Sequence, residues 1–592
     1  MPLHYAIRPA NPGAHLFHVT VTIEHPSTEG QIFTLPAWIP GSYMIREFAR
    51  HIVQIAALAG DERVPVEKLD KHTWRVPALG EGAGPLTLVY EVYAWDLSVR
   101  AAHLDTTHGF FNGSSVFLLP AGLEDEKVVV DILPPAGKEF SGWQIATGLK
   151  PARATRRHAF GTYTAANYDE LIDCPVEMGE FALASFKAHG VPHEVVITGR
   201  VPNLDIKRLT SDLQRVCEVQ IELFEPKSKA APFDRYVFMT LAVGDGYGGL
   251  EHRNSTALIC QRDDLPFVGM EETTEGYRQF LGLASHEYFH SWNVKRIKPA
   301  AFVPYDLSAE VNTRLLWLFE GFTSYYDDLM LLRSGLISET QYLDRLAKTL
   351  DTVQGASGRH KQSVAESSFD AWIKYYRQDE NSPNAIVSYY QKGSLIALVL
   401  DLTIRAQTQG KKSLDDVMRL LWSQHQEAGA DYAGVGEDDI TEAVFDATGL
   451  ELGQFIAELT EGTEDPDYAA LLGAFGVTLT AEAQTGARQR LGIKTAANGS
   501  EARIAHVYDG GAAQAAGLSG GDVLIALDGL RVTPAKLDAM LARYRRGDTL
   551  TATAFRRDEL MTFAIKLGGS EPARIKLALE AGRNKLRAGW LA

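Results

Sequence analysis

The sequence HEYFH at positions 286–290 combines residue types and spacing that could bind a metal ion. Residues four positions apart lie on one face of a helix, so the imidazoles of His286 and His290 can reach the same ion. Catalytic zinc sites use three protein ligands and leave one position open. Glu287 would stand beside that position, where a carboxylate can accept the proton of a metal-activated water. The pattern therefore predicts a hydrolytic zinc site, provided that a third ligand exists.

Glu320 is the best candidate for the third ligand. It follows His290 by thirty residues and lies within the apolar stretch LLWLFEGFTSYY. A carboxylate in such a stretch fits a hydrophobic core poorly unless it is paired or bound to a metal. The alternative is a buried salt bridge to Arg314 or Lys295. Because the HEYFH motif lies upstream, we favour the ligand role, with one Zn²⁺ ion as the cofactor.

Helices must position these residues, because the spacing of the two histidines works only on a helix. No Gly or Pro interrupts HEYFH, and apolar residues lead into it. Apolar residues recur at helical spacing in several further stretches of the same region. The predicted helices cover residues 273–292, 311–334, 338–352, 388–407 and 414–428.

The pattern of apolar and polar residues changes along the chain, and this change predicts a multidomain α+β protein. Residues 1–180 alternate apolar and polar residues between Gly and Pro breaks, which favours a β-sandwich-like domain without a catalytic group. Residues 181–465 pass from short strands into the helices and form the catalytic domain. Residues 472–568 return to strands and turns, and residues 571–592 read as a helical tail.

Composition narrows the possible partners and locations. The formal net charge of -17 argues against a nucleic-acid surface and against binding to anionic lipid. No apolar run reaches the roughly 18–20 residues of a membrane helix, and the N-terminus lacks a basic leader with an apolar run. We therefore expect a cytoplasmic protein. The three cysteines, Cys174, Cys217 and Cys260, are widely spaced and predict reduced thiols.

Several long motifs resemble one metallopeptidase family. HEYFHSWNVKRIKP and LLWLFEGFTSYY are similar to the gluzincins, in which an H-E-x-x-H helix is followed by a glutamate ligand on the next helix. Together with LPAWIPGSYMIREFARH at 35–51, they resemble the PDZ-bearing glycyl aminopeptidases. The resemblance implies a thermolysin-like catalytic domain and an aminopeptidase that removes small N-terminal residues, Gly or Ala, from peptides.

The sequence GGLEH at 248–252 resembles the G-A-M-E-N strand of the aminopeptidase N family. In that family the glutamate holds the free α-amino group of the substrate, and the resemblance places Glu251 in this role beside Gly248 and Gly249. A carboxylate is a suitable partner for a buried ammonium. His252 replaces the usual Asn. The alternative is a Gly-rich turn with an exposed Glu251.

The sequence YQKG at 390–393 is similar to the Tyr-x-Lys-Gly segment of the same enzymes, where the tyrosine donates a hydrogen bond to the oxyanion. The resemblance assigns this role to Tyr390. Tyr389 competes for it, and either tyrosine could instead be a core residue at a helix start.

The C-terminal region resembles a PDZ domain. RLGI at 490–493 is similar to a carboxylate-binding loop, and AAGL at 515–518 and GGDVL at 520–524 are similar to the central signature. PDZ domains bind extended peptides at a sheet edge and capture a terminal carboxylate. A C-terminal peptide is therefore a possible ligand. A purely structural domain is the alternative.

Zinc aminopeptidase is the leading hypothesis, with peptides as substrates. A thermolysin-like endopeptidase is the alternative within enzymes, and Glu251 separates the two because only an aminopeptidase needs an anchor for a free α-amino group. A PDZ peptide-binding scaffold with a vestigial zinc site is the alternative from another class. The sequence predicts neither an oligomeric state nor a role for Asn293, Lys295 and Arg296.

Overall fold

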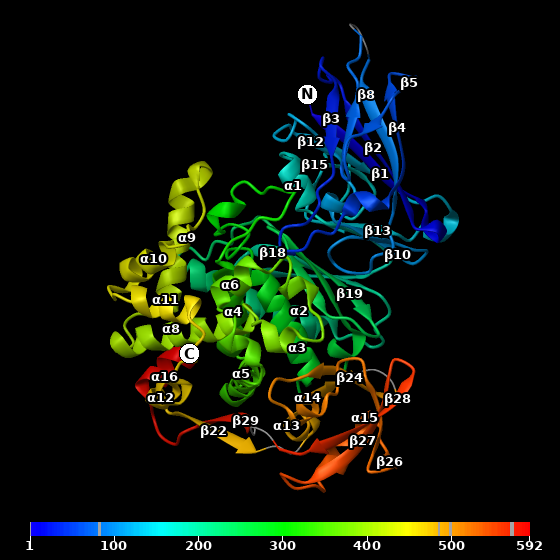
Figure 1. The fold of residues 1–592 in the computed structure, drawn as a ribbon. Coiled ribbons are helices and arrows are strands. Elements are labelled where there is room, and N and C mark those ends of the chain that lie inside the picture. Colours follow the sequence, from blue (N-terminus) through cyan, green and yellow to red (C-terminus); the bar gives the residue numbers. More distant parts are fainter. Residues whose placement is uncertain (1, 81–83, 484–485, 497–499, 569–572) are drawn as a thin grey trace. The chain divides into compact units, whose positions relative to one another are not determined.

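The computed structural model describes residues 2–80, 84–483, 486–496, 500–568 and 573–592. Within these residues the chain divides into two compact units. The first contains the chain up to Val311 together with 333–336 and 421–435, and the second contains 312–332, 337–420 and 436–592. Figure 1 shows the elements of both units along the chain.

The regular elements in the N-terminal part of the first unit are mostly strands, drawn in blue to cyan in Figure 1. Three sheets have the orders β14-β15-β12-β1-β2-β8-β4-β5, β13-β16-β10-β9 and β11-β3-β7-β6. The elements are β1 (Leu3–Asn11), β2 (Leu16–Ile23), β3 (Gln31–Thr34), β4 (Ile52–Ala59), β5 (Glu62–Val64), β6 (Glu67–Lys68), β7 (Thr73–Val76), β8 (Leu86–Tyr93), β9 (Ala102–Leu104), β10 (His108–Phe111), β11 (Leu119–Pro120), β12 (Val128–Ile132), β13 (Gln144–Thr147), β14 (Lys150–Pro151), β15 (Gly161–Ala165), α1 (Tyr168–Ile172) and β16 (Val176–Gly179).

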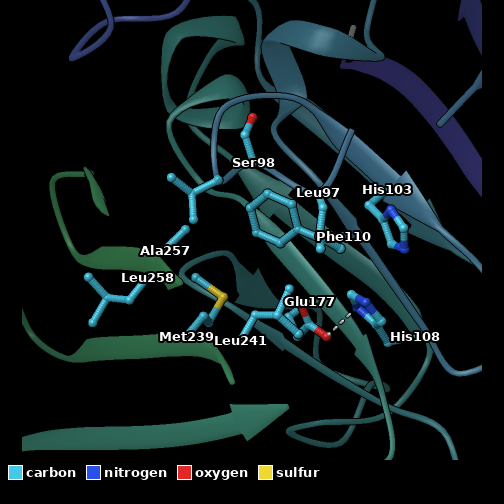
Figure 2. Close-up of a pocket in the computed structure, with 11 residues that line it drawn as sticks. Leu97, Ser98, His103, His108, Phe110, Glu177, Met239, Leu241, Ala257 and Leu258 are labelled. Atoms are coloured by element: carbon cyan, nitrogen blue, oxygen red, sulfur yellow. Dashed lines mark ion pairs between the residues drawn. The ribbon is translucent and has the colours of Figure 1, made fainter. Parts of the chain in front are cut away.

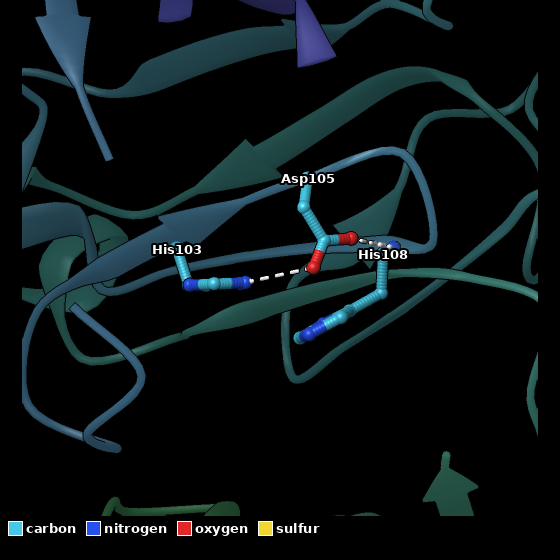
Figure 3. Close-up of side chains that lie close together, drawn as sticks. All are labelled: His103, Asp105 and His108. Carbon is cyan, nitrogen blue, oxygen red and sulfur yellow. Dashed lines mark hydrogen bonds and ion pairs between the residues drawn. The ribbon is translucent and has the colours of Figure 1, made fainter. Parts of the chain in front are cut away.

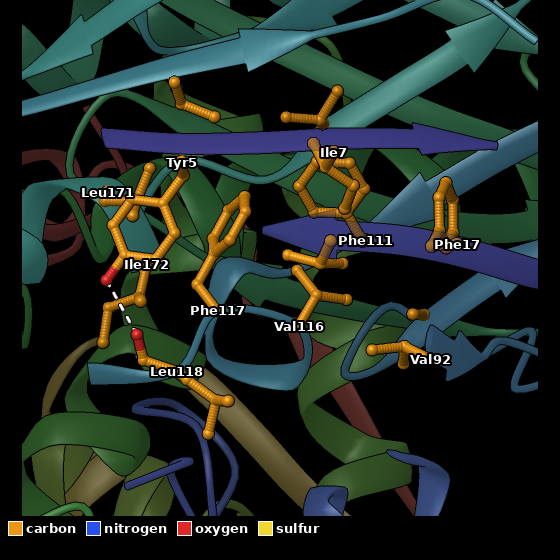
Figure 4. Packing of buried hydrophobic residues seen from close by; sticks show 14 of the residues in the cluster. Tyr5, Ile7, Phe17, Val92, Phe111, Val116, Phe117, Leu118, Leu171 and Ile172 are labelled. Carbon is orange, nitrogen blue, oxygen red and sulfur yellow. Dashed lines mark hydrogen bonds between the residues drawn. The ribbon is translucent and has the colours of Figure 1, made fainter. Parts of the chain in front are cut away.

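The alternating pattern of these strands explains their packing. Strand β2 exposes every second residue partly and buries the others, as the period of a half-buried strand requires. The buried residues meet in one apolar cluster, part of which Figure 4 shows around Tyr5 and Phe117. The hydroxyl of Tyr5 donates to the carbonyl of Leu118 at 2.8 Å, so this buried polar group is satisfied. The predicted β-rich N-terminal domain is confirmed.

A five-stranded sheet with the order β17-β18-β19-β21-β20 completes the first unit, and helices α2 and α3 pack against it. Strand β20 lies at one end of this sheet and pairs antiparallel with β21. Leu250 of β20 joins the apolar cluster of the N-terminal sheets. The elements are β17 (Ala182–Ala188), β18 (Val191–Thr198), α2 (Ile206–Phe224), β19 (Tyr236–Val243), β20 (Gly248–Glu251), β21 (Ser255–Gln261) and α3 (Glu275–Phe289).

Helices dominate the middle of the chain, as the sequence predicts. The five stretches predicted as helices correspond to α3, α4, α5, α8 and α9, and the largest difference is at the start of α4. The elements are α4 (Leu316–Arg333), α5 (Glu339–Gln354), α6 (Val364–Phe369), α7 (Ser382–Ala385), α8 (Gln391–Gln407), α9 (Leu414–Ala428), α10 (Asp439–Thr448), α11 (Gly453–Glu461) and α12 (Tyr468–Ala474). No helix in the described part of the chain is long and apolar enough to cross a membrane.

The C-terminal part of the second unit contains a larger sheet with the order β23-β24-β25-β27-β28, with β26 paired to β25, and a separate pair of strands, β22 and β29. The elements are β22 (Val477–Ala483), α13 (Ala487–Arg490), β23 (Ile493–Thr495), β24 (Ala502–Val507), α14 (Ala512–Ala516), β25 (Val523–Leu527), β26 (Leu530–Arg531), α15 (Pro534–Leu541), β27 (Thr549–Arg556), β28 (Glu559–Lys566), β29 (Ala573–Leu579) and α16 (Lys585–Leu591).

The tail differs from the helix expected over 571–592. Residues 571 and 572 lie outside the described residues, β29 follows them, and only α16 is helical. In β29, Ile575 and Leu577 are buried and their neighbours are exposed, which is the two-residue period of a strand. The strand pairs along its whole length with β22. Pairing with a strand almost a hundred residues earlier in the chain thus overrides the helical composition of the tail.

The loop expected to bind a carboxylate, residues 490–493, uses its amides internally. The N–H of Leu491 donates to the carbonyl of Ala487 at 2.9 Å, and the N–H of Gly492 donates to the carbonyls of Ala487 and Arg488 at 3.1 and 2.9 Å. A terminal carboxylate would have to displace these bonds. The PDZ likeness and its peptide ligand therefore remain predictions.

Candidate functional site

Helix α3 carries the HEYFH motif at its C-terminal end. Thr274 caps the start of the helix by accepting a hydrogen bond from the N–H of Tyr277 at 3.1 Å. The ring centroids of His286 and His290 lie 4.6 Å apart, with the ring planes nearly perpendicular. The two imidazoles therefore share one face of the helix, as the spacing predicts.

A backbone contact sets the tautomer of His290. Its Nδ1 lies 2.7 Å from the carbonyl oxygen of Asn293, and because a carbonyl only accepts, Nδ1 must carry the proton. The lone pair of this buried ring is then on Nε2, the atom that could bind a metal ion. A backbone carbonyl is a common partner for a metal-binding histidine and orients its ring. The contact gives Asn293 a role that the sequence does not predict.

Glu287 packs directly against strand β20. A Cβ atom added to Gly249 would lie 2.0 Å from Oε1 of Glu287, which is closer than any side chain tolerates. The glycine therefore allows helix α3 to bring this carboxylate against the strand. The result is a buried acid held between a helix end and a glycine backbone, beside the two histidines.

Glu251 ends strand β20 and is 3% exposed. Its Oε1 is buried and has no hydrogen-bond partner among the described residues. Ligand atoms of Glu251, Glu287 and His290 all lie within 4.8 Å of one another. The expected alternative, an exposed glutamate in a turn, is therefore wrong. A buried carboxylate oxygen without a donor is costly unless a cation binds there.

A loop of the N-terminal domain closes around Glu251. A Cβ atom on Gly41, whose φ is +94°, would lie 2.5 Å from both carboxylate oxygens of Glu251. The backbone of Gly41 thus forms one wall around this carboxylate. Gly41 belongs to the sequence motif at 35–51. The contact with Glu251 therefore explains why this position of the motif is a glycine.

Asp173 contacts both the segment that follows β20 and the segment that follows α3. It accepts a hydrogen bond from the N–H of Arg253 at 3.0 Å, lies 3.4 Å from Nδ1 of His252 and pairs with Nζ of Lys295 at 2.7 Å. Burial alone would raise the pKa of Asp173, but the charges of Lys295 and Arg253 hold it well below its usual value. Lys295 is therefore a structural cation.

Arg296 also has a structural role. Its guanidinium donates to the carbonyls of Ser291, Arg253 and Pro232 at 2.6, 3.1 and 2.7 Å. It thus secures the segment that follows the motif.

Glu320 belongs to helix α4 in the second unit and is 1% exposed. The two cations considered as its partners are engaged elsewhere: Lys295 pairs with Asp173, and the guanidinium of Arg314 lies over the ring of Phe369. A Cβ atom on the next residue, Gly321, would lie 2.5 Å from Cα of Gly393. Helices α4 and α8 thus cross at the pair Gly321 and Gly393. This close crossing explains why both positions are glycine.

The tyrosines next to α8 differ in accessibility. Tyr389 is fully buried, and Tyr390 is partly exposed. The hydroxyl of Tyr390 lies 3.2 Å from that of Tyr376, and the ring of Tyr375 stacks on it at 5.5 Å. Burial raises the pKa of Tyr389, and Tyr376 and the carboxylate of Glu320 raise it further. Glu320 and this tyrosine cluster are therefore neighbours within the second unit.

The predicted site residues fall into two groups. His286, Glu287, His290, Gly248, Gly249 and Glu251 belong to the first unit, where α3 packs on β20. Glu320 and Tyr390 belong to the second unit, where α4 crosses α8. Each group is preassembled by contacts between its own elements.

A second group of potential metal ligands consists of His103 on β9, Asp105 in the turn that follows and His108 at the start of β10 (Figure 3). Oδ1 of Asp105 already accepts from the N–H and hydroxyl of Thr107, both at 2.6 Å, and from the N–H of His108 at 3.1 Å. The two rings stack at 4.9 Å with only 26° between their planes. Nearly parallel rings hold their in-plane lone pairs in nearly parallel planes, which does not favour convergence on one ion between them. This geometry is that of a turn and not of a shared metal ion.

His108 and His103 line a small cavity of about 20 Å³ (Figure 2). Nδ1 of His108 lies 3.3 Å from Oε1 of Glu177, which also accepts from the hydroxyl of Thr198 at 2.9 Å. Burial alone would lower the pKa of His108, but the carboxylates of Glu177 and Asp105 raise it above its usual value. The N-terminal domain therefore contains a buried contact between a histidine and a carboxylate that the sequence does not indicate.

Comparisons with known proteins give consistent matches. Residues 4–180 match the Peptidase M61 N-terminal domain, and residues 279–396 match the M61 glycyl aminopeptidase family. The chain is similar to the crystal structure of an aminopeptidase N family protein from Idiomarina loihiensis, with 41% identity over 100% of both chains and a TM-score of 0.94. No curated protein matches the chain significantly.

More distant matches are an M1 zinc metallopeptidase from Deinococcus radiodurans and aminopeptidase A from Legionella pneumophila. The first shares 15% identity over 79% of this chain and 94% of the other, with a TM-score of 0.46. The second shares 12% identity over 78% of this chain and 49% of the other, also with a TM-score of 0.46.

Proposed function

Because the chain belongs to the M61 glycyl aminopeptidase family, we propose that it is a zinc-dependent aminopeptidase that releases small N-terminal residues, Gly or Ala, from peptides. The observation that carries this proposal is Glu251, a buried carboxylate with an unpartnered oxygen beside Glu287 and His290. A free α-ammonium group is the cation that a peptide N-terminus brings to such a position.

His286, His290 and Glu320 would hold the zinc ion. The donor set of two imidazoles and one carboxylate is typical of catalytic zinc. The hydrogen bond from Nδ1 of His290 to Asn293 supports the assignment, because it leaves Nε2 as the ligand atom. The burial of Glu320 in an apolar helix supports it as well. Zinc would supply Lewis-acid polarisation, which makes a carbonyl more electrophilic and a water molecule more acidic.

Glu287 would act as the general base and then as the general acid. It takes a proton from the attacking water and delivers it to the leaving amine. Its contact with Gly249 supports this role, because the glycine backbone limits where the carboxylate can lie. A fixed carboxylate loses little to reorganisation when the proton moves.

Glu251 would bind the α-amino group and so place the first peptide bond at the catalytic residues. The backbone of Gly248 and Gly249 would run beside the bound peptide, because β20 is at the end of its sheet. The wall that Gly41 forms against Glu251 supports a preference for small N-terminal residues, since it narrows the space around the anchor.

Tyr390 would donate a hydrogen bond to the oxyanion that forms when water attacks. Its partial exposure supports it over Tyr389, which is fully buried. Tyr376 supports the same choice, because its hydroxyl lies 3.2 Å from that of Tyr390 and can orient it. Donors aimed at developing charge contribute about 2.7–4 kcal/mol to catalysis in other enzymes.

The test compares free and N-blocked substrates. Wild-type protein should cleave glycine p-nitroanilide and leave its N-acetyl derivative uncleaved, because acetylation removes the charge that Glu251 binds. Glu251→Gln should lower kcat/KM for the free substrate by roughly 100-fold, while Glu272→Gln, an exposed control in the same unit, should not. Equal cleavage of both substrates by wild type would support the endopeptidase alternative instead.

A further inference from the structure

Strand β20 has a cationic side chain close to the end opposite Glu251. Arg100, from the loop between β8 and β9, donates from Nη2 to the carbonyl oxygen of Gly249 at 3.1 Å. Its Nη1 lies 3.4 Å from the position that a Cβ atom of Gly248 would occupy. The guanidinium therefore lies against the glycine backbone of the strand with no side chain between them.

Arg100 lacks a counter-ion in the described part of the chain. Its Nε is buried without a hydrogen-bond partner, and none of the described carboxylates lies within ion-pair distance of the guanidinium. Arg157 and Arg253 of the same unit both pair with carboxylates, whereas the guanidinium of Arg100 donates to a backbone carbonyl. A partly buried guanidinium with unused donors is suited to a carboxylate, which it can bind through two parallel hydrogen bonds.

The backbone positions that Arg100 contacts, Gly248 and Gly249, lie two to three residues before Glu251 on β20. A strand rises about 3.3 Å per residue, so Gly248 and Glu251 lie roughly 10 Å apart along β20. An extended peptide of three residues spans a similar distance between its α-amino group and its terminal carboxylate. A peptide that pairs antiparallel with β20 would start at Glu251 and run back toward Gly248.

We propose that Arg100 binds the C-terminal carboxylate of the substrate, so that the enzyme acts preferentially on tripeptides with a free C-terminus. This inference rests on the proposed aminopeptidase function, because it needs the substrate α-amino group at Glu251. The unpaired anion and the unpaired cation then neutralise the two ends of one zwitterionic peptide. Longer peptides would carry an uncharged peptide bond past Arg100 and lose this contact.

The experiment measures kcat/KM for Gly-Ala-Ala and for its C-terminal amide. The wild-type protein should prefer the acid by about 10- to 100-fold, the value of a charge-assisted hydrogen bond, and the difference should lie mainly in KM. Arg100→Met should abolish the preference, and Arg100→Lys should restore part of it. Arg63→Met, an exposed control in the same domain, should keep it.

A second measurement avoids turnover. Isothermal titration calorimetry on Glu287→Gln should show that the acid binds at least about 10-fold tighter than the amide. Equal kcat/KM or equal binding of the two peptides in the wild-type background would overturn the role of Arg100. So would an Arg100→Met variant that loses acid and amide hydrolysis equally, because that result indicates a purely structural contact.

Glycine p-nitroanilide distinguishes this inference from the proposed function. The substrate has an α-amino group and no carboxylate, so its cleavage reports on the aminopeptidase site alone. Cleavage of the anilide without an acid preference overturns only the role of Arg100. If neither the anilide nor the tripeptide is cleaved, the proposed function fails, and the inference fails with it.

Discussion

Gly249→Ala tests how closely the activity depends on the position of Glu287. The added Cβ would lie 2.0 Å from Oε1 of Glu287, and side-chain carbons do not approach other atoms closer than 3.0 Å. The carboxylate must therefore retreat by at least about 1 Å, and it is almost completely buried. A displacement of about 1 Å at a reacting group costs roughly 100-fold in rate, or about 2.7 kcal/mol of transition-state stabilisation.

The assay is kcat/KM for glycine p-nitroanilide, with the zinc content and Tm measured on the same preparations. Gly249→Ala should lose about 100-fold in kcat/KM and keep its zinc, because the three atoms nearest the added Cβ all belong to Glu287, which is not a proposed ligand. Gly244→Ala is the matched control, since a Cβ atom at Gly244 meets nothing within 4 Å. A folded Gly249→Ala variant with nearly wild-type kcat/KM would refute the reasoning.

Three further predictions concern stability. Gly393→Ala inserts a Cβ atom 2.8 Å from the backbone of α4 and should lower the free energy of unfolding in urea by about 3 kcal/mol; an unchanged midpoint would contradict the glycine crossing. Lys295→Met leaves Asp173 buried without its closest cation and should cost about 3–5 kcal/mol in the same assay, whereas a loss below about 1 kcal/mol would contradict the buried pair. The pKa of His108 is raised in the folded state, so its pairing with Glu177 stabilises the protein fully below pH 6.5 and less as the pH rises through the folded pKa. The difference in unfolding free energy between wild type and His108→Gln should therefore shrink from pH 6 to pH 8, and a difference independent of pH would rule out this pair as its source.

Local patterns in the sequence predict the helix of the metal motif and the residues on its face. The spacing of His286 and His290 depends only on helix geometry, which neighbours in the chain determine. A carboxylate within an apolar stretch can also be recognised from its neighbours in the sequence. This local pattern identifies Glu320 as a buried acid. The alternating strands of the N-terminal domain follow from the same kind of short-range pattern.

Contacts between distant segments explain what the sequence could not predict. Asp173, the partner of Lys295, lies more than a hundred residues earlier in the chain, and Gly41 is even farther from Glu251. The close approach of Gly321 and Gly393 depends on how two helices cross. Their glycines are visible in the sequence, but the reason for them requires the tertiary structure.

The PDZ-like region is another case in which tertiary contacts could not be predicted from the sequence. Its motif at 490–493 is visible in the sequence, but the hydrogen bonds that occupy the amides of Leu491 and Gly492 are not. Whether a peptide can displace these bonds decides between a binding module and a structural domain. Titration of the full chain with C-terminal peptides would measure this directly.

The central claim is that His286, His290 and Glu320 hold one zinc ion. The most direct test is the zinc content per chain, measured by mass spectrometry on wild type and on Glu320→Ala after dialysis. The wild-type protein should retain about one zinc ion per chain, and Glu320→Ala should lose most of it while keeping its fold by circular dichroism. A wild-type chain without zinc, or a Glu320→Ala variant with undiminished zinc, would contradict the claim.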